Sequence, residues 1–214
     1  MKQIFCISGL GADHLLFQHL SIPGYELVPL TWKPHSKNDN MCSYAAKMVK
    51  GITAKNATVI GLSFGGMLAV EIGKQHPTWK IFLVSSAKTS AELGYDNAFI
   101  RWIGEKELIP ASVITKPNVI SLALLGAKTK EDKKLITEIM DDADPAFYKW
   151  CVHALLSWDN HTYPPGIIHI HGTYDRVIRP ANVHPRYWIG GGSHIMIYNR
   201  AREVSKIISE CLSM

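Results

Sequence analysis

The stretch that decides the fold runs from Val59 to Met67 and reads Val-Ile-Gly-Leu-Ser-Phe-Gly-Gly-Met. It joins a short apolar run, typical of a buried strand, to a longer segment with helical periodicity. Glycines lie two residues before and two residues after Ser63, which gives the pattern G-x-S-x-G. Between a strand and a helix, this pattern predicts a sharp turn that exposes the serine hydroxyl beside the positive end of a helix dipole. A glycine-rich turn without catalysis is the alternative.

The segments on either side of this turn alternate between short apolar runs and longer segments of helical periodicity. That alternation predicts a parallel sheet with helices on both faces. The expected strands are Ile4 to Ser8, Glu26 to Leu30, Thr58 to Gly61, Ile81 to Ser85, Ile167 to His171 and Arg186 to Ile189. The expected helices of this sheet are Leu15 to Leu20, Met41 to Ile52, Phe64 to His76 and Ala201 to Cys211.

The alternation breaks between Ser85 and Ile167, where the apolar residues keep helical periodicity without a convincing strand. Residues 1–86 and 166–214 are therefore expected to form an α/β core, and residues 87–165 an inserted helical cap within a single domain. Proline, glycine and paired aspartates divide the insertion into four expected helices. These cover Ala91 to Trp102, Ser112 to Leu125, Glu131 to Met140 and Pro145 to Ser157.

Two further side chains complete a chemistry that Ser63 needs. A serine becomes a nucleophile through a base, and the base is oriented by a carboxylate. Asp175 follows one expected strand and His194 follows the last one. Because parallel strands end at one edge of a sheet, the three side chains are predicted to meet there. Taken singly, Asp175 is equally well a turn or capping aspartate, and His194 a loop histidine.

A catalytic serine also needs backbone N–H donors for the negative oxygen of its tetrahedral intermediate. Phe64, directly after the serine, is one expected donor. The second donor is expected from the loop Ser8-Gly9-Leu10-Gly11 after the first strand, and within that loop we expect the backbone N–H of Leu10 to donate. These glycines also fit a tight turn with no catalytic role.

Together these features resemble the α/β-hydrolase family, and in particular its small capped esterase-type branch with the carboxylesterase of biotin synthesis and related methyl esterases. The resemblance spans the chain and implies a minimal α/β-hydrolase fold with about six mostly parallel strands in the order 2-1-3-4-5-6. Two departures stand out. Ser8 lies where members often carry histidine, and the short interval from Asp175 to Arg186 leaves room for about one helical turn.

The resemblance implies a serine hydrolase that cleaves a carboxylic ester or thioester of a small apolar or amphipathic acid, with no metal or other cofactor. Ser63 would attack, His194 would transfer the proton, and Asp175 would orient the histidine. A lyase or C–C hydrolase with the same triad, and a non-catalytic ligand receptor on the same fold, stay open. Trp150 and Trp158 are candidates to line the pocket, although helical spacing also fits packing inside the cap itself.

The composition excludes some classes of protein and of binding partner. The chain has 214 residues, of which 47% are hydrophobic and 19% charged, and this excludes intrinsic disorder. Lysine and arginine number 23 against 18 acidic residues. Nine of the basic and 11 of the acidic residues fall in the expected cap, so the positive surplus belongs to the core helices. Because those helices should face solvent away from the strand ends, we expect a small-molecule substrate and no nucleic-acid partner.

The remaining sequence features indicate structural roles rather than a further functional site. No apolar run approaches the roughly 18 residues of a spanning helix, so no membrane partner is expected. The cysteines form no short-spaced pair, which favours free thiols in the cytoplasm. His169 and His171 share one face of a strand, but no third ligand has useful spacing, so they are interpreted as core residues. The sequence does not indicate an oligomeric state.

Overall fold

The structure is a computed structural model that describes residues 1–10, 12–94 and 117–213. Its centre is a six-stranded sheet in the order β2-β1-β3-β4-β5-β6, and all neighbouring strands run parallel. The predicted number of strands and their order are therefore confirmed. The strands are β1 (Lys2–Ile7), β2 (Tyr25–Pro29), β3 (Thr58–Leu62), β4 (Lys80–Val84), β5 (Ile168–Gly172) and β6 (Tyr187–Ile189).

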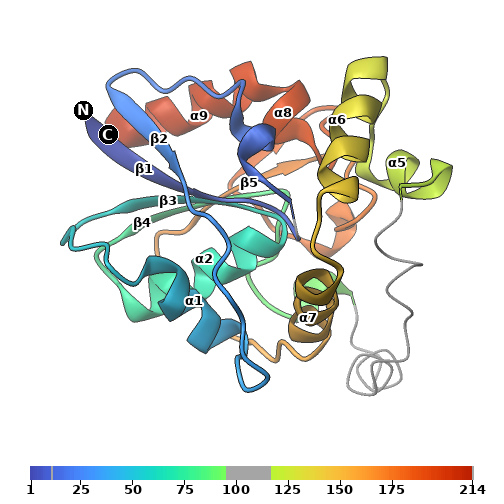
Figure 1. Cartoon of the computed structure of the whole chain (residues 1–214). Helices are drawn as coiled ribbons and strands as arrows, with labels where there is room; N and C mark the ends of the chain where they lie inside the picture. Colours follow the sequence, from blue (N-terminus) through green and yellow to red (C-terminus); the bar gives the residue numbers. More distant parts are fainter. Residues whose placement is uncertain (11, 95–116, 214) are drawn as a thin grey trace.

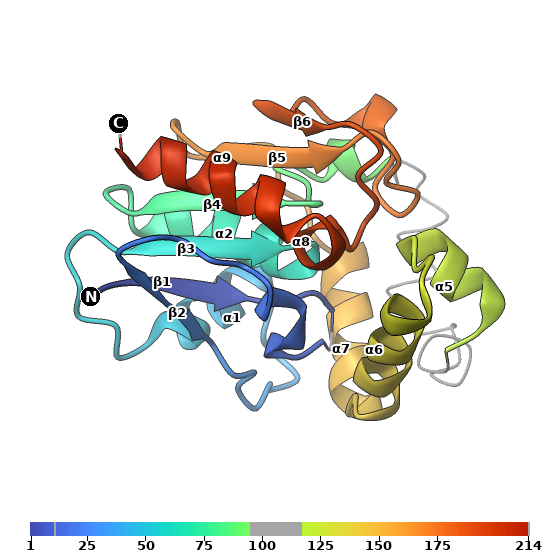
Figure 2. The same ribbon diagram turned by 90° about the horizontal axis from the view of Figure 1, so that it is seen from above.

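Helices cover both faces of this sheet (Figures 1 and 2). One face carries α1 (Met41–Val49) and α2 (Phe64–Gln75). The other carries the 3₁₀ turn η1 (His14–Phe17) and the helices α8 (Met196–Asn199) and α9 (Ala201–Ser213). The chain thus forms the three-layer α/β sandwich that the alternating pattern predicts.

Alternation along the strands explains why the sheet has two core layers. Successive side chains of a strand point to opposite faces. In β3, Val59 packs with α1 and α2, whereas Ile60 and Leu62 pack with α8 and α9. Both sets are buried, so Val59, Ile60 and Leu62 of β3 are all apolar, as expected for a strand of a parallel sheet covered on both faces.

The segment between β4 and β5 lies beyond the carboxyl ends of the strands (Figure 2). Its described elements are the 3₁₀ turn η2 (Ala91–Leu93) and the helices α5 (Val119–Leu125), α6 (Lys130–Asp141) and α7 (Pro145–Leu156). Phe147 of α7 packs into the layer of α1 and α2, and Ile136 of α6 packs into the layer of α8 and α9. The insertion therefore extends both core layers past the sheet edge.

Several helix boundaries differ from the predictions. Residues 95–102 and 112–116 of two expected helices lie outside the described residues. α5 begins only at Val119, because the side chain of Asn118 accepts the N–H groups of Ile120 and Ser121 and caps the helix. α1 ends at Val49 instead of Ile52, since Lys50 has an extended ψ of 119°. The expected helix at 15–20 is a single 3₁₀ turn, and α8 was not predicted.

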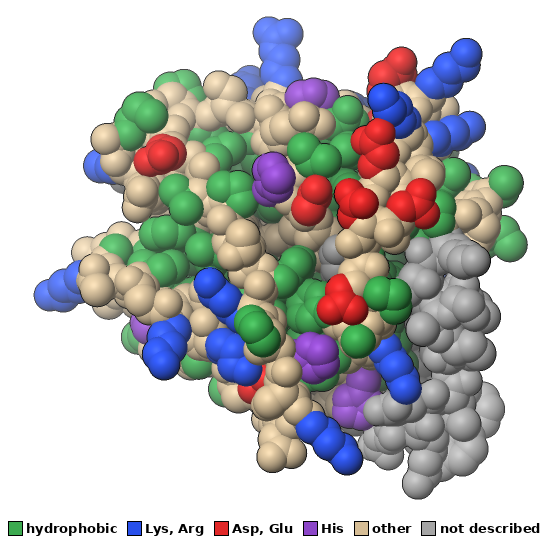
Figure 3. Space-filling view, viewed as in Figure 1, with side chains coloured by type: hydrophobic (Ala, Val, Ile, Leu, Met, Phe, Trp, Pro, Cys, Tyr) green, Lys and Arg blue, Asp and Glu red, His purple; other side chains and the backbone are tan. Residues whose placement is uncertain are grey.

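The short interval after Asp175 matches its prediction. It holds one 3₁₀ turn, η3 (Pro180–Asn182), where a longer helix has no room. The charged surface is mixed on the face seen in Figure 3, with acidic and basic side chains interspersed and the basic ones spread around its periphery. Within the described ranges, no helix is long and apolar enough to cross a membrane.

Candidate active site

Ser63 sits in a strained turn between β3 and α2. Its backbone has φ 51° and ψ −120°, a conformation that L-residues rarely adopt and that costs on the order of 1–3 kcal/mol. Hydrogen bonds to both of its backbone groups hold it there. The N–H of Ser63 donates to the carbonyl of Val84 at 3.0 Å. The carbonyl of Ser63 accepts from the Ser86 hydroxyl at 2.7 Å and from the N–H groups of Gly66 and Met67 at 2.9 and 3.3 Å. These hydrogen bonds from neighbouring residues therefore keep the strained conformation of Ser63 in place.

The glycines of the G-x-S-x-G pattern are required by close backbone contacts. A Cβ atom on Gly61 would lie 2.5 Å from the Cα of Gly66. A Cβ on Gly65 would overlap the carbonyl oxygens of Ile7 and Ser8 at the end of β1. Only glycine lets α2 approach both β3 and β1 this closely. The first turn of α2 is thereby pressed against the strand ends, where Ser63 is half-buried.

The structure brings the three predicted triad residues together. His194 Nε2 lies 2.9 Å from Ser63 Oγ, and His194 Nδ1 lies 2.8 Å from Asp175 Oδ2. Both His194 and Asp175 are buried. Since an ionised carboxylate only accepts, Nδ1 of His194 carries the proton, and Nε2 of the neutral ring is free to accept from the serine hydroxyl. This is the arrangement that activates a serine nucleophile.

Backbone bonds join the loops that carry Asp175 and His194. The N–H of Thr173 donates to Ile189 at 3.0 Å, and the N–H of Tyr174 donates to Gly192 at 2.9 Å. Gly172 permits this approach, because a Cβ atom there would lie 3.0 Å from the Cα of Gly192 and closer still to its carbonyl group. The two loops therefore form one unit, which sets the spacing between carboxylate and imidazole.

Electrostatics favour the ionised form of Asp175. Burial alone would raise the pKa of its carboxyl group, but the neighbouring His194 and His171 and the N–H of Ile178 together lower it. The N–H groups of Val177 and Ile178 both donate to Oδ1 at 2.9 Å. One carboxylate oxygen is thus held by the backbone, and the other faces His194.

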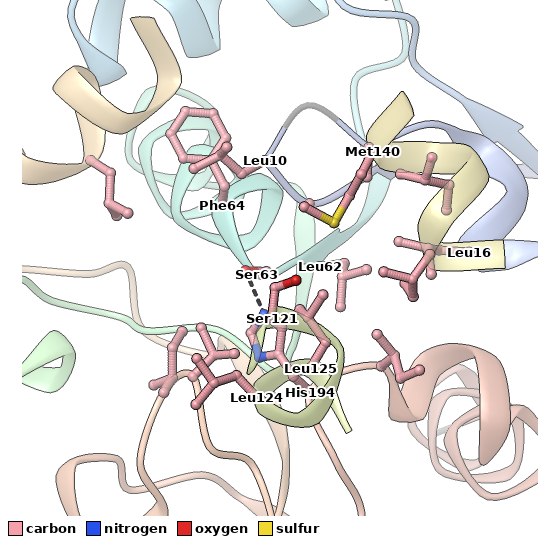
Figure 4. Close-up of a pocket in the computed structure, with 18 of the residues that line it drawn as sticks. Leu10, Leu16, Leu62, Ser63, Phe64, Ser121, Leu124, Leu125, Met140 and His194 are labelled. Carbon is pink, nitrogen blue, oxygen red and sulfur yellow. Dashed lines mark hydrogen bonds between the residues drawn. The ribbon is translucent and has the colours of Figure 1, made fainter. Parts of the chain in front are cut away.

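The two residues predicted to supply oxyanion donors both border the site. Phe64 is the first residue of α2, so its N–H is one of those with no partner within the helix. Leu10 lies in the loop after β1, and in Figure 4 its side chain lies beside that of Phe64. A Cβ on Gly9 would lie 3.7 Å from the Cβ of Ser63, which places this loop against the serine. Gly11 lies outside the described residues.

A cavity of about 370 Å³ opens onto Ser63 and His194. Its walls come from the core and from α5, α6 and α7, and most of its lining is apolar (Figure 4). Met140 of α6 extends its sulfur toward the centre of the cavity. Among the described residues of the lining, the polar side chains are Ser63, Ser121, Tyr148 and His194. Burial raises the pKa of the Tyr148 phenol to about 12, so this group stays protonated.

Trp150 and Trp158 are not among the described residues that line this cavity, so its lining gives no support to that prediction. Trp150 packs against Tyr44 and Phe147, with ring centroids 4.4 and 5.7 Å away. The indole N–H of Trp158 donates to Glu71 of α2 at 2.9 Å. Both tryptophans bind the insertion to the outer helices, since the face of α7 that carries Trp150 turns toward α1.

Sequence reasoning missed the residues that do line the cavity from the insertion. Tyr148 and Leu155 lie seven residues apart on α7 and so share a helix face, and Ile136, Ile139 and Met140 lie on one side of α6. That spacing was visible, but it does not tell which face of a helix meets a cavity. By contrast, the interpretation of His169 and His171 as core residues is confirmed, because they are 1% and 0% exposed.

No group of three or more His, Cys, Asp or Glu side chains in residues 1–10, 12–94 and 117–213 is arranged to hold a metal ion. The site as described consists of a nucleophile, a base, a carboxylate and an apolar cavity. Each of these comes from a loop at the carboxyl edge of the sheet, from α2, or from the insertion. This arrangement is suited to attack on a carbonyl carbon whose substituent is apolar.

No family model matches this chain, and no curated protein matches it. Solved structures do. An esterase from Exiguobacterium antarcticum aligns with a TM-score of 0.73 and 14% identity, covering 100% of this chain and 92% of that one. The enol-lactonase from Burkholderia xenovorans LB400 aligns at 0.69 and 16%, with 100% and 92% covered. The Bacillus megaterium epoxide hydrolase aligns at 0.72 and 12%, with 100% and 94% covered.

These likenesses extend over the whole chain, although fewer than one residue in five is identical. At this level of identity the likeness shows the fold, and it agrees with the six-stranded parallel sheet of this chain. The chain has the α/β-hydrolase fold.

Proposed function

We propose that this protein is a serine hydrolase that cleaves a carboxylic ester or thioester of a small apolar or amphipathic acid. The observation that carries the proposal is the continuous chain of hydrogen bonds from Ser63 through His194 to Asp175, opening onto an apolar cavity. The esterases and the enol-lactonase with this fold act on the same type of bond, according to their names. Residues 87–165 act as the cap that completes the cavity.

The proposed reaction follows from these positions. Ser63 Oγ attacks the carbonyl carbon while His194 Nε2 takes its proton, and Asp175 stabilises the imidazolium that forms. The N–H groups of Leu10 and Phe64 donate to the oxyanion. His194 then returns the proton to the departing alcohol or thiol, which leaves an acyl group on Ser63. A water molecule, deprotonated by His194, releases the acid and restores the serine.

Two other functions use parts of the same site. A lyase or C–C hydrolase would keep the triad and break a different bond. A ligand receptor would keep the cavity and need no reactive serine. The strain at Ser63 favours the hydrolase, because a serine held in a costly conformation beside a base is typical of a functional site.

A fluorophosphonate probe tests the proposal directly. Wild-type protein is expected to be labelled on Ser63, and Ser63→Ala is expected to remove the labelling completely, because the probe reacts with an activated serine. Ser86→Ala is unsuitable as the control, since it removes a bond to Ser63, so Ser157→Ala serves instead. Absence of Ser63-dependent labelling would refute the hydrolase. Labelling without turnover of a panel of p-nitrophenyl esters and acyl-thioesters would favour the lyase.

Met140 is expected to limit the length of the acyl group. Its side chain extends into the cavity, so Met140→Ala should enlarge the space opposite Ser63. We expect the optimum in a p-nitrophenyl ester series to move to chains about two carbons longer, with roughly a tenfold change in the ratio of kcat/KM between long and short esters. Lys134→Ala, on the exposed side of the same helix, should leave the series unchanged. If Met140→Ala had the same chain-length optimum as wild type, the acyl group would not bind beside Met140.

The cysteines support a cytoplasmic location for this activity, which we include in the proposal. All four are free, and Cys42 is exposed while Cys6, Cys151 and Cys211 are buried. An exposed free thiol suits a reducing compartment. The substrate is proposed to be a small molecule, because the cavity lies between the core and the insertion and its lining carries few polar groups.

A further inference from the structure

His171 is a buried imidazole that the proposed reaction does not use. It lies on β5, is 0% exposed, and is separated from Asp175 by only three residues. Its Nε2 atom lies 3.0 Å from the carbonyl oxygen of Ile178 and 3.6 Å from Asp175 Oδ2. The other ring nitrogen, Nδ1, is buried and has no hydrogen-bond partner among the described residues. The ring therefore directs one nitrogen at the turn that carries the triad carboxylate.

The protonation state of His171 follows from these contacts. A carbonyl oxygen can only accept, so Nε2 must carry the proton and donate it to Ile178. Burial lowers the pKa of His171, and this keeps the ring neutral with Nδ1 unprotonated. Trp188 packs edge-on against the ring, with centroids 5.9 Å apart and planes at 90°. His171 is thus a neutral donor held in one orientation.

The bond to Ile178 closes the turn around Asp175. Ile178 uses its N–H to donate to Asp175 Oδ1 at 2.9 Å, and its carbonyl to accept from His171. Both polar groups of this peptide segment are consequently fixed, one by the carboxylate and one by the histidine. Ile178 is 4% exposed, so water cannot readily replace the lost donor. Without His171, the Ile178 carbonyl would have to move toward another donor and take the Asp175 turn with it.

We propose that His171 is a positioning residue for Asp175: by donating to the Ile178 carbonyl, it fixes the turn whose N–H groups aim the carboxylate at His194. This proposal rests on the proposed function for its kinetic consequence, but its structural claim does not depend on turnover. The protein therefore provides two independent readouts, the rate and the state of His194.

Three substitutions at His171 distinguish the effect of losing the Nε2–H donor from the effect of losing the volume of the ring. In His171→Gln the amide nitrogen can reach the position of Nε2, whereas in His171→Asn it is too short to reach Ile178. His171→Leu removes the donor altogether. We expect His171→Leu and His171→Asn to lower kcat about 10- to 100-fold, as for a displaced catalytic group, with KM nearly unchanged. His171→Gln should keep kcat within about threefold of wild type, because the donor is replaced.

The matched control is His169→Phe, which exchanges the other buried imidazole of β5 and leaves the bond from His171 to Ile178 in place. We expect wild-type kcat from it. Thermal unfolding of each variant shows whether it folds. If His171→Leu does not fold, the comparison of His171→Asn with His171→Gln carries the test, since both place an amide at the same position.

The second readout is the ¹H–¹⁵N NMR signal of the His194 Nδ1–H group in protein with ¹⁵N-labelled histidine. With Asp175 displaced, the hydrogen bond from His194 Nδ1 to the carboxylate weakens, so the downfield signal of this proton should move upfield in His171→Asn and His171→Leu and return in His171→Gln. This holds whether or not the protein turns over an ester, so failure of Ser63 labelling would refute the function alone. Wild-type kcat and an unmoved His194 Nδ1–H signal in His171→Asn, or a folded His171→Gln variant that restores neither, would overturn the role of His171.

Discussion

Asp175→Asn is expected to lower kcat/KM about 10⁴-fold while the protein stays folded. The reason lies in how the carboxylate is held. Two N–H groups, from Val177 and Ile178, donate to Oδ1, so the carbonyl oxygen of an asparagine amide would occupy that position. The amide nitrogen would then face His194 in place of Oδ2. An amide nitrogen donates, and so the bond with Nδ1 could form only if Nδ1 carried no proton.

That exchange reverses the roles of the two imidazole nitrogens. With Nδ1 accepting from the amide, Nε2 of a neutral ring carries the proton and points it at Ser63 Oγ, 2.9 Å away. His194 then cannot take the proton of the serine, although every heavy atom keeps its place. The loss is expected in kcat, because binding of the ester depends on the cavity and not on the tautomer.

The measurement is steady-state hydrolysis of the best p-nitrophenyl ester, together with the rate of fluorophosphonate labelling, which should fall in parallel. Asp142→Asn, which removes an exposed carboxylate at the end of α6, serves as the control and should match wild type. Thermal unfolding of both variants excludes a folding defect. A loss below about tenfold in Asp175→Asn would show that Asp175 does not set the tautomer of His194.

The sheet and the meeting of Ser63, Asp175 and His194 could be predicted from sequence, because each depends on a strong local pattern or a topological rule. Apolar runs of about five residues mark buried parallel strands, and parallel strands end at one edge. Ser63, Asp175 and His194 each follow such a strand, so their meeting required no knowledge of side-chain packing. The same holds for the one-turn segment between Asp175 and Arg186, where the number of residues alone limits the structure.

The wall of the cavity could not be predicted in this way. α7 carries apolar residues on more than one side, with Trp150 on the face that packs on α1 and Tyr148 on the face that lines the cavity. Helical periodicity shows that such faces exist but not which neighbour each one meets. The same limit applies to His171: its burial was predictable, but its bond to Ile178 depends on a turn that closes only in three dimensions.

Gly65→Ala tests the contact on which the whole site depends, and we expect it to destabilise the protein by about 3 kcal/mol or more. The added Cβ would overlap the carbonyl oxygens of Ser8 and Ile7 and lie 2.7 Å from the Ile7 carbonyl carbon. All of these are backbone atoms of β1 and its following loop, so no change of side-chain rotamer relieves the overlap. α2 must then move away from the strand.

Movement of α2 affects catalysis as well as stability. The helix begins with Phe64, directly after Ser63, whereas the loop after β1 carries Leu10. Separating the two would therefore pull the proposed oxyanion donors apart. We expect Tm to fall by about 6–12 °C for a protein of this size. In the fraction that stays folded, labelling of Ser63 should slow at least about 100-fold, since a displacement near 1 Å is sufficient for such a loss.

Gly190→Ala is the matched control. Gly190 also lies in a loop at the carboxyl edge of the sheet, but a Cβ there meets no atom within 4 Å. Its replacement should leave labelling unchanged and Tm equal or slightly higher, because alanine restricts the unfolded chain. Calorimetry and labelling of the two variants side by side separate crowding at one contact from any general need for glycine near the site. If Gly65→Ala labelled and unfolded like wild type, the close approach of α2 to β1 would not be what holds Ser63 in place.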